Sequence, residues 1–221
     1  MTYTLYFPYY NQPEPLERQL EWYNEMPVDL KFFIVDDGSQ DHPLDVSLFK
    51  GFSHPVEAWR IDKDVPWNQP ECNNLAFRYI STDKVLRTDI DHFYDEPTLS
   101  FLSTFQQGKR TLLMFTKRYA LEGGARTPNY HPNSYLIYRD AYWTTGGYNE
   151  YFSGNYGSDD TEWMERTGLA TLSHPLAFNF ASKACETKKL NRDTAPNHRK
   201  LHEKERPFFT FQNENSYQKL C

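Results

Sequence analysis

Short apolar runs alternate with helix-length amphipathic segments through the first part of the sequence, and this alternation restricts the possible folds more than any other feature. The runs with strand character are residues 2–7, 31–35, 55–61, 84–88, 111–117 and 134–138. The segments with helical character are residues 11–27, 70–81 and 98–106. This order is typical of α/β domains in which helices flank a largely parallel sheet. The 221 residues are enough for one such domain with a sizeable core.

Acidic residues follow two of the predicted strands at the point where each strand ends. The strand at residues 31–35 leads into Asp36-Asp37-Gly38-Ser39, and the strand at residues 84–88 leads into Asp89-Ile90-Asp91. Open α/β sheets bind ligands at the carboxyl ends of their strands. We therefore expect a ligand crevice where these two turns meet.

Two further motifs follow in the second half of the chain. Gly146 and Gly147 precede Tyr148-Asn149-Glu150, and an acidic pair, Asp159 and Asp160, lies near the start of an amphipathic helix. Paired glycines permit a tight turn, and a helix N-terminus favours an anion. Each motif alone also fits an ordinary turn or helix cap, so it is their combination that indicates a function.

In this order and spacing, the four motifs resemble those of the family 2 glycosyltransferases of the GT-A fold. That family's pattern is V-D-D-G-S-x-D, then D-x-D, then G-G-[FY]-[DN]-E and an acidic pair. The resemblance extends from residue 3 to about residue 172, and includes the first strand and turn at residues 7–11 and a helix start at residues 67–76. It implies one GT-A domain at residues 1–182, with a Rossmann-like mixed, mostly parallel sheet, and a basic C-terminal segment at residues 183–221 that is a flap or tail of the same domain.

The resemblance also implies a reaction: transfer of a hexose, with inversion, from a UDP-sugar to a glycan or other hydroxyl acceptor. The expected donor is a UDP-hexose such as UDP-glucose or UDP-galactose. Asp160 would be the general base that deprotonates the acceptor, with Asp159 preceding it. Alternatives are a GT-A binding module that has lost turnover, or another phosphoryl or nucleotidyl enzyme that uses paired carboxylates.

By the same resemblance, Asp91 would bind Mn²⁺ or Mg²⁺ directly, and Asp89 would contact the ribose or help to hold the metal. Carboxylates spaced one residue apart suit such hard cations. The cation would neutralise charge on the departing diphosphate. Of the histidines beyond the acidic pair (His174, His198 and His202), His198 is the preferred third ligand.

Asp37 would contact the uracil edge. The other residues that the resemblance places at the nucleotide are Pro8, Tyr10, Asn11, Asn74 and Asp89. Many family members have a basic residue where this chain has Asn73, so we expect the diphosphate contact to come from the C-terminal segment.

Sugar rings stack on aromatic side chains, and this indicates a sugar or acceptor site. The residues assigned to it are Trp67, Trp143, Gly147 and Tyr148. Because the chain has 16 Tyr, 16 Phe and 5 Trp, core packing is the default role for any single aromatic residue. Acceptor recognition would also involve the Gly- and Pro-rich loop at residues 123–133.

Charge is distributed unevenly along the chain. Residues 183–206 hold eight Lys or Arg and four Asp or Glu (8 − 4 = +4), whereas the whole chain has a net charge of −6. This segment fits either a solvated, flexible tail or a flap over a polyanionic ligand. An acidic chain with a pI of about 5.6 argues against binding to nucleic acid.

We expect a soluble, cytoplasmic protein without a membrane span. The three cysteines are widely spaced, which fits a reducing compartment, and no apolar run approaches the roughly 20 residues of a spanning helix. The sequence also shows no signal-peptide pattern.

Overall fold

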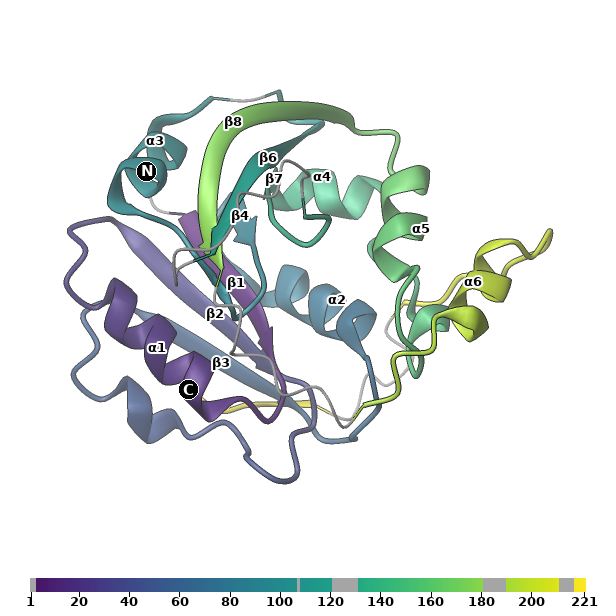
Figure 1. Cartoon of the computed structure of the whole chain (residues 1–221), viewed down its shortest axis with the longest axis horizontal. Helices are drawn as coiled ribbons and strands as arrows, with labels where there is room; N and C mark the ends of the chain where they lie inside the picture. Colours follow the sequence, from purple (N-terminus) through teal and green to yellow (C-terminus); the bar gives the residue numbers. More distant parts are fainter. Residues whose placement is uncertain (1–2, 107, 121–130, 181–189, 211–216) are drawn as a thin grey trace.

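The computed structural model describes residues 3–106, 108–120, 131–180, 190–210 and 217–221. A nine-stranded sheet with the order β5-β8-β6-β7-β4-β1-β2-β3-β9 forms the centre of the molecule (Figure 1). The strands are β1 (Tyr3–Tyr9), β2 (Leu30–Asp36), β3 (Val56–Ile61), β4 (Lys84–Arg87), β5 (His92–Phe93), β6 (Thr111–Ala120), β7 (Tyr135–Tyr138), β8 (Ala170–Phe180) and β9 (Tyr217–Lys219). The helices are α1 (Pro13–Tyr23), α2 (Gln69–Tyr79), α3 (Glu96–Thr104), α4 (Arg139–Thr144), α5 (Asp159–Arg166) and α6 (Ala195–Leu201), with 3-10 turns η1 (Val46–Phe49) and η2 (Glu150–Phe152).

Most of the strands run in one direction. β3, β2, β1 and β4 are parallel neighbours, and β6 and β8 are parallel to each other. β7 is antiparallel to both β4 and β6, so those two strands share a direction, and β5 and β9 pair antiparallel with β8 and β3. The predicted mixed, mostly parallel α/β sheet is confirmed.

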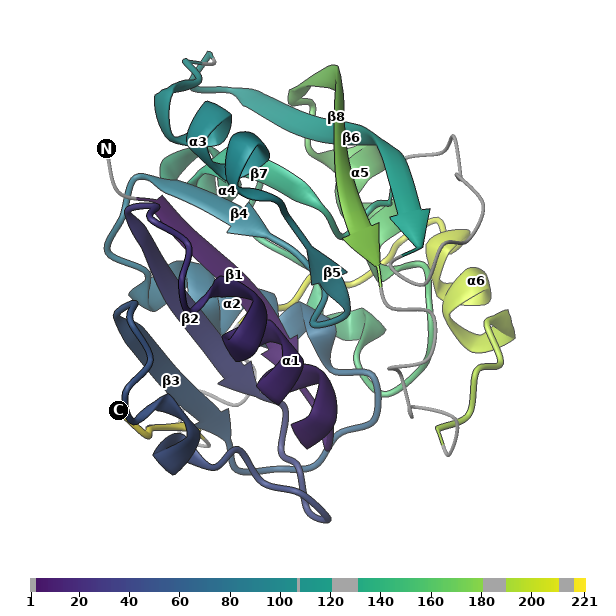
Figure 2. The ribbon, with the colours of Figure 1, turned by 60° about the vertical axis from the view of Figure 1, so that its left-hand side comes forward.

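Helices cover both faces of the sheet, because the buried strands are apolar on both sides. In β2, Phe32 and Ile34 pack in one core cluster and Phe33 and Val35 in the other, as alternation along a strand requires. α1 and α3 pack in the first cluster, and α2, α4 and α5 in the second. Figures 1 and 2 show the two groups of helices on opposite sides of the sheet.

The C-terminal segment packs against the domain. β9 pairs antiparallel with the outer strand β3, with Trp59 opposite Lys219, and so covers that edge of the sheet. On α6, buried Asn197 donates hydrogen bonds to the carbonyls of Phe152, Asn155 and Gly157 at 2.8–2.9 Å. A wholly solvated tail is therefore wrong for the described part of this segment.

The predicted loop at residues 123–133 lies largely outside the described residues, and the side chain of His174 does so too. None of the helices in the described ranges combines the length and apolarity that a membrane span requires.

Candidate functional site

A cavity of about 290 Å³ opens at the carboxyl ends of β1, β2 and β4, where the sequence predicts a crevice. Its walls are Pro8, Tyr9, Tyr10, Gln12, Asp37, Trp67, Gln69, Asp89, Ile90, Asp91, His131, Asn133, Tyr156, Leu190 and Arg192. A second cavity of about 240 Å³ contains Asp159 and Asp160 and shares Trp67, His131 and Tyr156 with the first. The two acidic turns and the acidic pair therefore line two adjacent cavities that share part of their walls.

In the first acidic turn, the two aspartates have different surroundings. Asp36 shapes the turn: its carboxylate accepts hydrogen bonds from the backbone N–H groups of Ser39 (2.9 Å) and Leu44 (3.0 Å) and pairs with Arg60 at 3.4 Å. Asp37 is 6% exposed and lines the cavity. Among the described residues, nothing forms a hydrogen bond with its buried Oδ1 atom.

Burial, together with the negative charge of Glu71, raises the pKa of Asp37 to about 8. The ordinary value for an aspartate is 3.8. The Asp37 carboxyl is therefore mostly protonated at neutral pH, and it can both donate and accept a hydrogen bond.

The second acidic turn is dominated by a buried cation that we did not predict from the sequence. Arg87, at the end of β4, is fully buried and pairs with Asp89 Oδ1 at 2.6 Å. It also donates to Gln69 Oε1 at 3.0 Å and lies 3.4 Å from Asn73 Oδ1. Arg87 thus brings a positive charge next to the position where the family pattern has a basic residue and this chain has Asn73.

Burial alone would raise the pKa of Asp89, but the Arg87 guanidinium and the nearby His131 and His92 rings lower it to about 2. Asp89 is therefore ionised at neutral pH, in contrast to Asp37.

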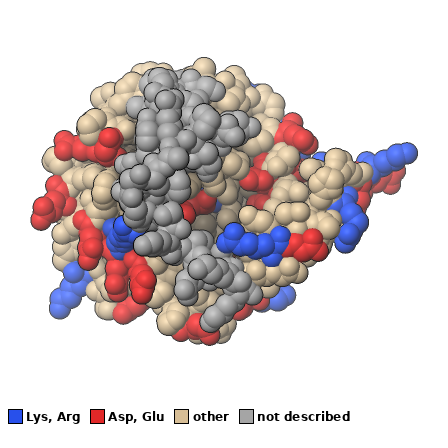
Figure 3. All heavy atoms as spheres, in the orientation of Figure 1, with Lys and Arg blue, Asp and Glu red and all other residues tan. Residues whose placement is uncertain are grey.

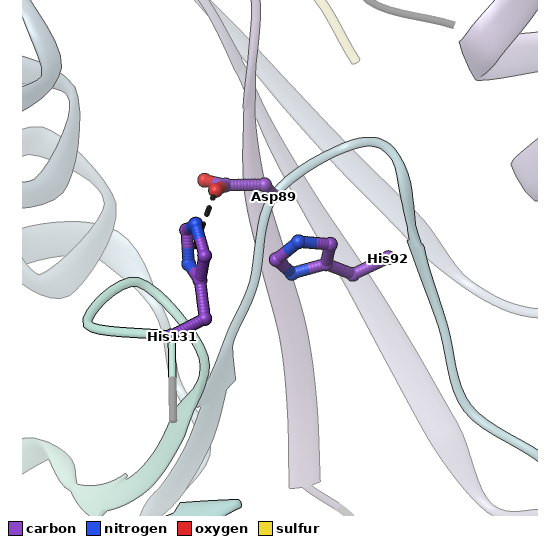
Figure 4. Close-up of side chains that lie close together, drawn as sticks. All are labelled: Asp89, His92 and His131. Carbon is purple, nitrogen blue, oxygen red and sulfur yellow. Dashed lines mark ion pairs between the residues drawn. The ribbon is translucent and has the colours of Figure 1, made fainter. Parts of the chain in front are cut away.

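Two histidines lie beside Asp89 (Figure 4). His131 Nδ1 is 3.6 Å from Asp89 Oδ2, and the His92 and His131 rings are 4.8 Å apart. One ligand atom from each of Asp89, His92 and His131 lies within 4.8 Å of the others. In the described part of the chain, Asp89, His92 and His131 are the cluster of potential ligand residues close enough together to hold a metal ion.

Asp91 lines the same cavity, and its Oδ1 atom is 3.6 Å from His92 Nε2. The expectation that His198 completes the metal site is not met. His198 is exposed on α6, where its Nε2 atom lies 3.3 Å from His202 Nε2, and it lines neither cavity. His92 directly follows the D-x-D motif and could have been noticed there, whereas His131 stands in a loop without a recognisable pattern.

The acidic pair begins α5. Asp160 Oδ1 accepts a hydrogen bond from the Thr161 backbone N–H at 2.7 Å, as a residue in the first turn of a helix can. Burial, and then the charge of Asp160, raise the pKa of Asp159 to about 7. Both side chains face the second cavity.

Four residues that the sequence predicts to contact ligands line neither cavity and instead support the site from behind: Asn74, Trp143, Gly147 and Tyr148. Asn74 is fully buried: it donates to Tyr148 O (2.9 Å) and Glu150 Oε1 (2.7 Å) and accepts from the Tyr142 hydroxyl (2.6 Å). Gly147 has φ +77°, and a Cβ there would lie 2.5 Å from Asn74 Oδ1.

Tyr148 is fully buried and stacks on Trp163 at 4.9 Å, and Trp143 Nε1 donates to Phe77 O at 3.2 Å. Contrary to the expectation from the sequence, Tyr148 packs in the core and Trp143 against it, so a sugar ring would have to displace core contacts to reach them. Asn11 is also outside the cavity walls; its Oδ1 atom accepts the His42 backbone N–H at 2.8 Å and so fixes the loop after β2.

The C-terminal segment reaches the cavity through Leu190 and Arg192. Trp67 Nε1 donates to Asn191 O at 2.6 Å, and the Arg192 guanidinium lies 5.6 Å from the ring centres of both Trp67 and Tyr156. Lys and Arg side chains extend from the neighbouring region around α6 (Figure 3). Arg192 is therefore a cation held by two aromatic rings at the edge of the cavity.

No protein-family model matches the sequence, and no curated protein matches it either. Solved structures of glycosyltransferases do match the fold. TarS 1–349 from S. aureus, in complex with UDP-GlcNAc, superposes with a TM-score of 0.70 at 12% identity, covering 91% of this chain and 64% of that one. The mannosyltransferase PcManGT from Pyrobaculum calidifontis, in complex with GDP-Man and Mn²⁺, gives 0.59 at 18% identity, covering 81% and 56%.

A Drosophila β1,4-galactosyltransferase 7 mutant, in complex with manganese, UDP-Gal and xylobiose, gives a TM-score of 0.53 at 13% identity, covering 96% of this chain and 77% of that one. At these identities the likeness defines the fold, which is that of the GT-A glycosyltransferases. The chain spans less than two thirds of the TarS fragment and of the mannosyltransferase.

Proposed function

We propose that this chain is a GT-A glycosyltransferase that moves a hexose from a UDP-sugar to a hydroxyl group of a glycan or other acceptor, with inversion at the anomeric carbon. The observation that carries the proposal is the convergence of Asp37, Asp89 and Asp91 on one cavity at the strand ends, next to a second cavity that holds Asp159 and Asp160. UDP-glucose and UDP-galactose are the first donors to test.

The surroundings of Asp37 favour uracil as the base of the donor nucleotide. Its Oδ1 atom is buried without a hydrogen-bond partner in the described structure, so a ligand that supplies an N–H donor would remove a desolvation cost. The uracil edge presents one N–H group between two carbonyl oxygens. A protonated carboxyl can accept a hydrogen bond from that N–H and donate its own proton to one of the two carbonyl oxygens. The corresponding edge of guanine presents two adjacent donor groups and so favours an ionised carboxylate. The raised pKa of Asp37 therefore favours UDP over GDP.

The diphosphate would lie between the second acidic turn and Arg192. Asp89 and Asp91 supply carboxylates for Mn²⁺ or Mg²⁺, which would act as a Lewis acid towards the departing diphosphate. Asp89 fits this role because Arg87 holds its Oδ1 atom and keeps the carboxylate ionised. Arg192 lies at the edge of the same cavity and can donate charge-assisted hydrogen bonds to phosphate oxygens.

The acceptor would occupy the second cavity. Asp160 would take the proton of the acceptor hydroxyl as its oxygen bonds to the anomeric carbon and the bond to the diphosphate breaks. The choice of Asp160 rests on its place in the family pattern. Asp159, next to it in the same cavity, has a pKa raised to about 7, so a large fraction of it would be protonated near pH 7, and this would limit the negative charge around the base.

The test is calorimetric titration of UDP into the protein with Mn²⁺, then with EDTA, repeated with Asp91→Asn and with GDP. We expect metal-dependent UDP binding that is tighter than GDP binding and is lost in the variant. UDP-sugar turnover with a panel of acceptors would follow. No UDP binding under any condition would refute the uridine assignment, and metal-dependent UDP binding without turnover would favour the binding-module alternative.

A further inference from the structure

The side chains beside the second acidic turn bring two imidazoles to a site where the sequence predicts the carboxylates of Asp89 and Asp91 with a single histidine, His198. Asp89 Oδ2 faces His131, and the His92 ring lies next to both (Figure 4). Ligand atoms held at about 2.1 Å from one ion, in a tetrahedral or octahedral arrangement, lie roughly 3.0–3.4 Å apart. Here the three atoms lie within 4.8 Å of one another, and Asp89 Oδ2 and His131 Nδ1 are 3.6 Å apart. Side-chain movements of roughly 1–2 Å would therefore close the site around an ion.

Hydrogen bonds already orient the three side chains. Arg87 holds Asp89 Oδ1, which leaves Oδ2 on the side of His131. His92 Nδ1 shares a 2.7 Å hydrogen bond with Ser134 Oγ, and its Nε2 atom lies 3.6 Å from Asp91 Oδ1. Outer partners of this kind fix the ring orientation of histidine ligands in metal sites.

We infer that Asp89, His92 and His131, with Asp91 beside them, form a mixed carboxylate–imidazole centre that binds first-row transition ions and discriminates against Mg²⁺. Imidazole is a ligand of transition ions, whereas Mg²⁺ prefers oxygen ligands and keeps much of its water. Two imidazoles therefore bias the site towards Mn²⁺ and, more strongly, Co²⁺. Both histidines precede the acidic pair, unlike the His198 ligand expected from the sequence.

This inference rests on the proposed function only for the role of the metal, because metal binding itself can be measured without nucleotide. The protein should carry no polyhistidine tag. The second imidazole pair, His198 and His202, is removed by the substitution His198→Ala, which serves as the background for all variants. In this background we expect Co²⁺ to bind at least tenfold more tightly than Mn²⁺, and Mg²⁺ to bind at least tenfold more weakly than Mn²⁺.

His131→Ala is the main variant, because the His131 side chain is 25% exposed and its loss should be tolerated by the fold. We expect at least a tenfold loss of Co²⁺ affinity by calorimetry, together with a change in the visible absorption of bound Co²⁺ as a nitrogen ligand is lost. His92→Ala should have the same effect, with thermal unfolding as a check because His92 is buried. The matched control is His42→Ala, which removes an exposed histidine outside both cavities.

Unchanged Co²⁺ affinity and an unchanged spectrum in His131→Ala would overturn the inference, and so would equal affinities for Mg²⁺ and Mn²⁺. Either result would indicate an oxygen-only site and would leave the proposed UDP binding intact. Conversely, absence of UDP binding with the metal result as expected would refute the proposed function and leave the metal centre standing.

Discussion

The two acidic turns that meet at the cavity keep their carboxyl groups in opposite protonation states. Asp37, in the turn after β2, is buried without a cationic partner, and its pKa rises to about 8. Asp89, in the turn after β4, has a side chain that is 21% exposed and that pairs with buried Arg87, and its pKa falls to about 2. Both turns carry aspartates at a strand end, so the difference comes from their surroundings: Asp89 has the Arg87 guanidinium and two histidine rings beside it, whereas Asp37 has Glu71.

This difference divides the cavity into two chemical halves. The side with Asp37 can form uncharged hydrogen bonds, which suits a nucleobase, and the side with Asp89 and Asp91 carries negative charge, which suits a cation and through it a diphosphate. Opposite pKa shifts of neighbouring carboxyl groups are common where acidic residues have separate roles in one site.

The largest expected effect comes from removing the guanidinium. Arg87→Met leaves the partly buried Asp89 without its cation and removes the donor that Asn133 O and Gln69 Oε1 share, so we expect a loss of about 3–5 kcal/mol in the free energy of unfolding. Urea denaturation at pH 7 measures it. The double variant Arg87→Met/Asp89→Asn should recover a large part of the loss, because no uncompensated charge remains. A single variant within about 1 kcal/mol of wild type would show that Arg87 does not set the state of Asp89.

The second prediction concerns the pH dependence of stability. Because the pKa of Asp37 rises from 3.8 unfolded to about 8 folded, its contribution is fully present below about pH 4 and is lost as the pH rises towards 8. Asp89 has the opposite sign: its contribution is present above about pH 4 and is lost as the pH falls towards 2.

Asp37→Asn should therefore be more stable than wild type at pH 8, by about 3 kcal/mol after local relaxation around the charge, and nearly equal to it at pH 4. Denaturant unfolding from pH 4 to pH 8 measures the slope due to Asp37, and the same measurement extended down to pH 2 measures the slope due to Asp89. Asp41→Asn, at an exposed carboxyl after the same turn, is the matched control and should leave the curve unchanged. A curve for Asp37→Asn that runs parallel to wild type would contradict the raised pKa.

A third prediction distinguishes residues that bind ligand, in the acidic turns, from buried residues such as Asn74 that only stabilise the fold behind them. Asn74→Ala removes the amide that joins Tyr142, Tyr148 and Glu150, and leaves buried polar groups without partners, so we expect a loss of about 2 kcal/mol in unfolding free energy. UDP affinity at 10 °C, where the variant stays folded, should be unchanged. A large loss of UDP affinity with unchanged stability would instead favour the nucleotide contact expected from the sequence.

The fold was predictable where burial dominates the pattern. β2 and β4 begin and end within one residue of the predicted runs, because an apolar stretch followed directly by turn residues leaves little choice: Phe32 to Val35 before Asp36-Asp37-Gly38, and Val85-Leu86 before Asp89. The sequence pattern does not predict β9, which has only three residues, or α6, a short polar helix anchored by Asn197. Their stability comes from contacts with distant parts of the chain, which local patterns do not encode.

The site was predictable to a similar degree. Asp37, Asp89 and Asp91 line the expected cavity because strand ends place them there. Arg87 and His131 were missed, because a charged residue inside a strand and a histidine in a loop carry no recognisable spacing. Tyr148 was misassigned, because sequence cannot distinguish an aromatic ring that faces a ligand from one that stacks in the core, as this ring does on Trp163.

The smallest expected effect concerns Arg192, the cation at the edge of the cavity that both acidic turns line. If its guanidinium binds the diphosphate, Arg192→Ala should weaken UDP binding about tenfold, which corresponds to one charge-assisted hydrogen bond. Uridine, which lacks phosphate, should bind both proteins equally, because the half of the cavity with Asp37 is unaffected. Arg199→Ala removes an exposed arginine of the same segment outside the cavity and should change neither affinity. Equal losses of affinity for uridine and UDP would show that Arg192 acts on the shape of the cavity through the Trp67 and Tyr156 rings. Diphosphate binding would then depend on the second acidic turn alone.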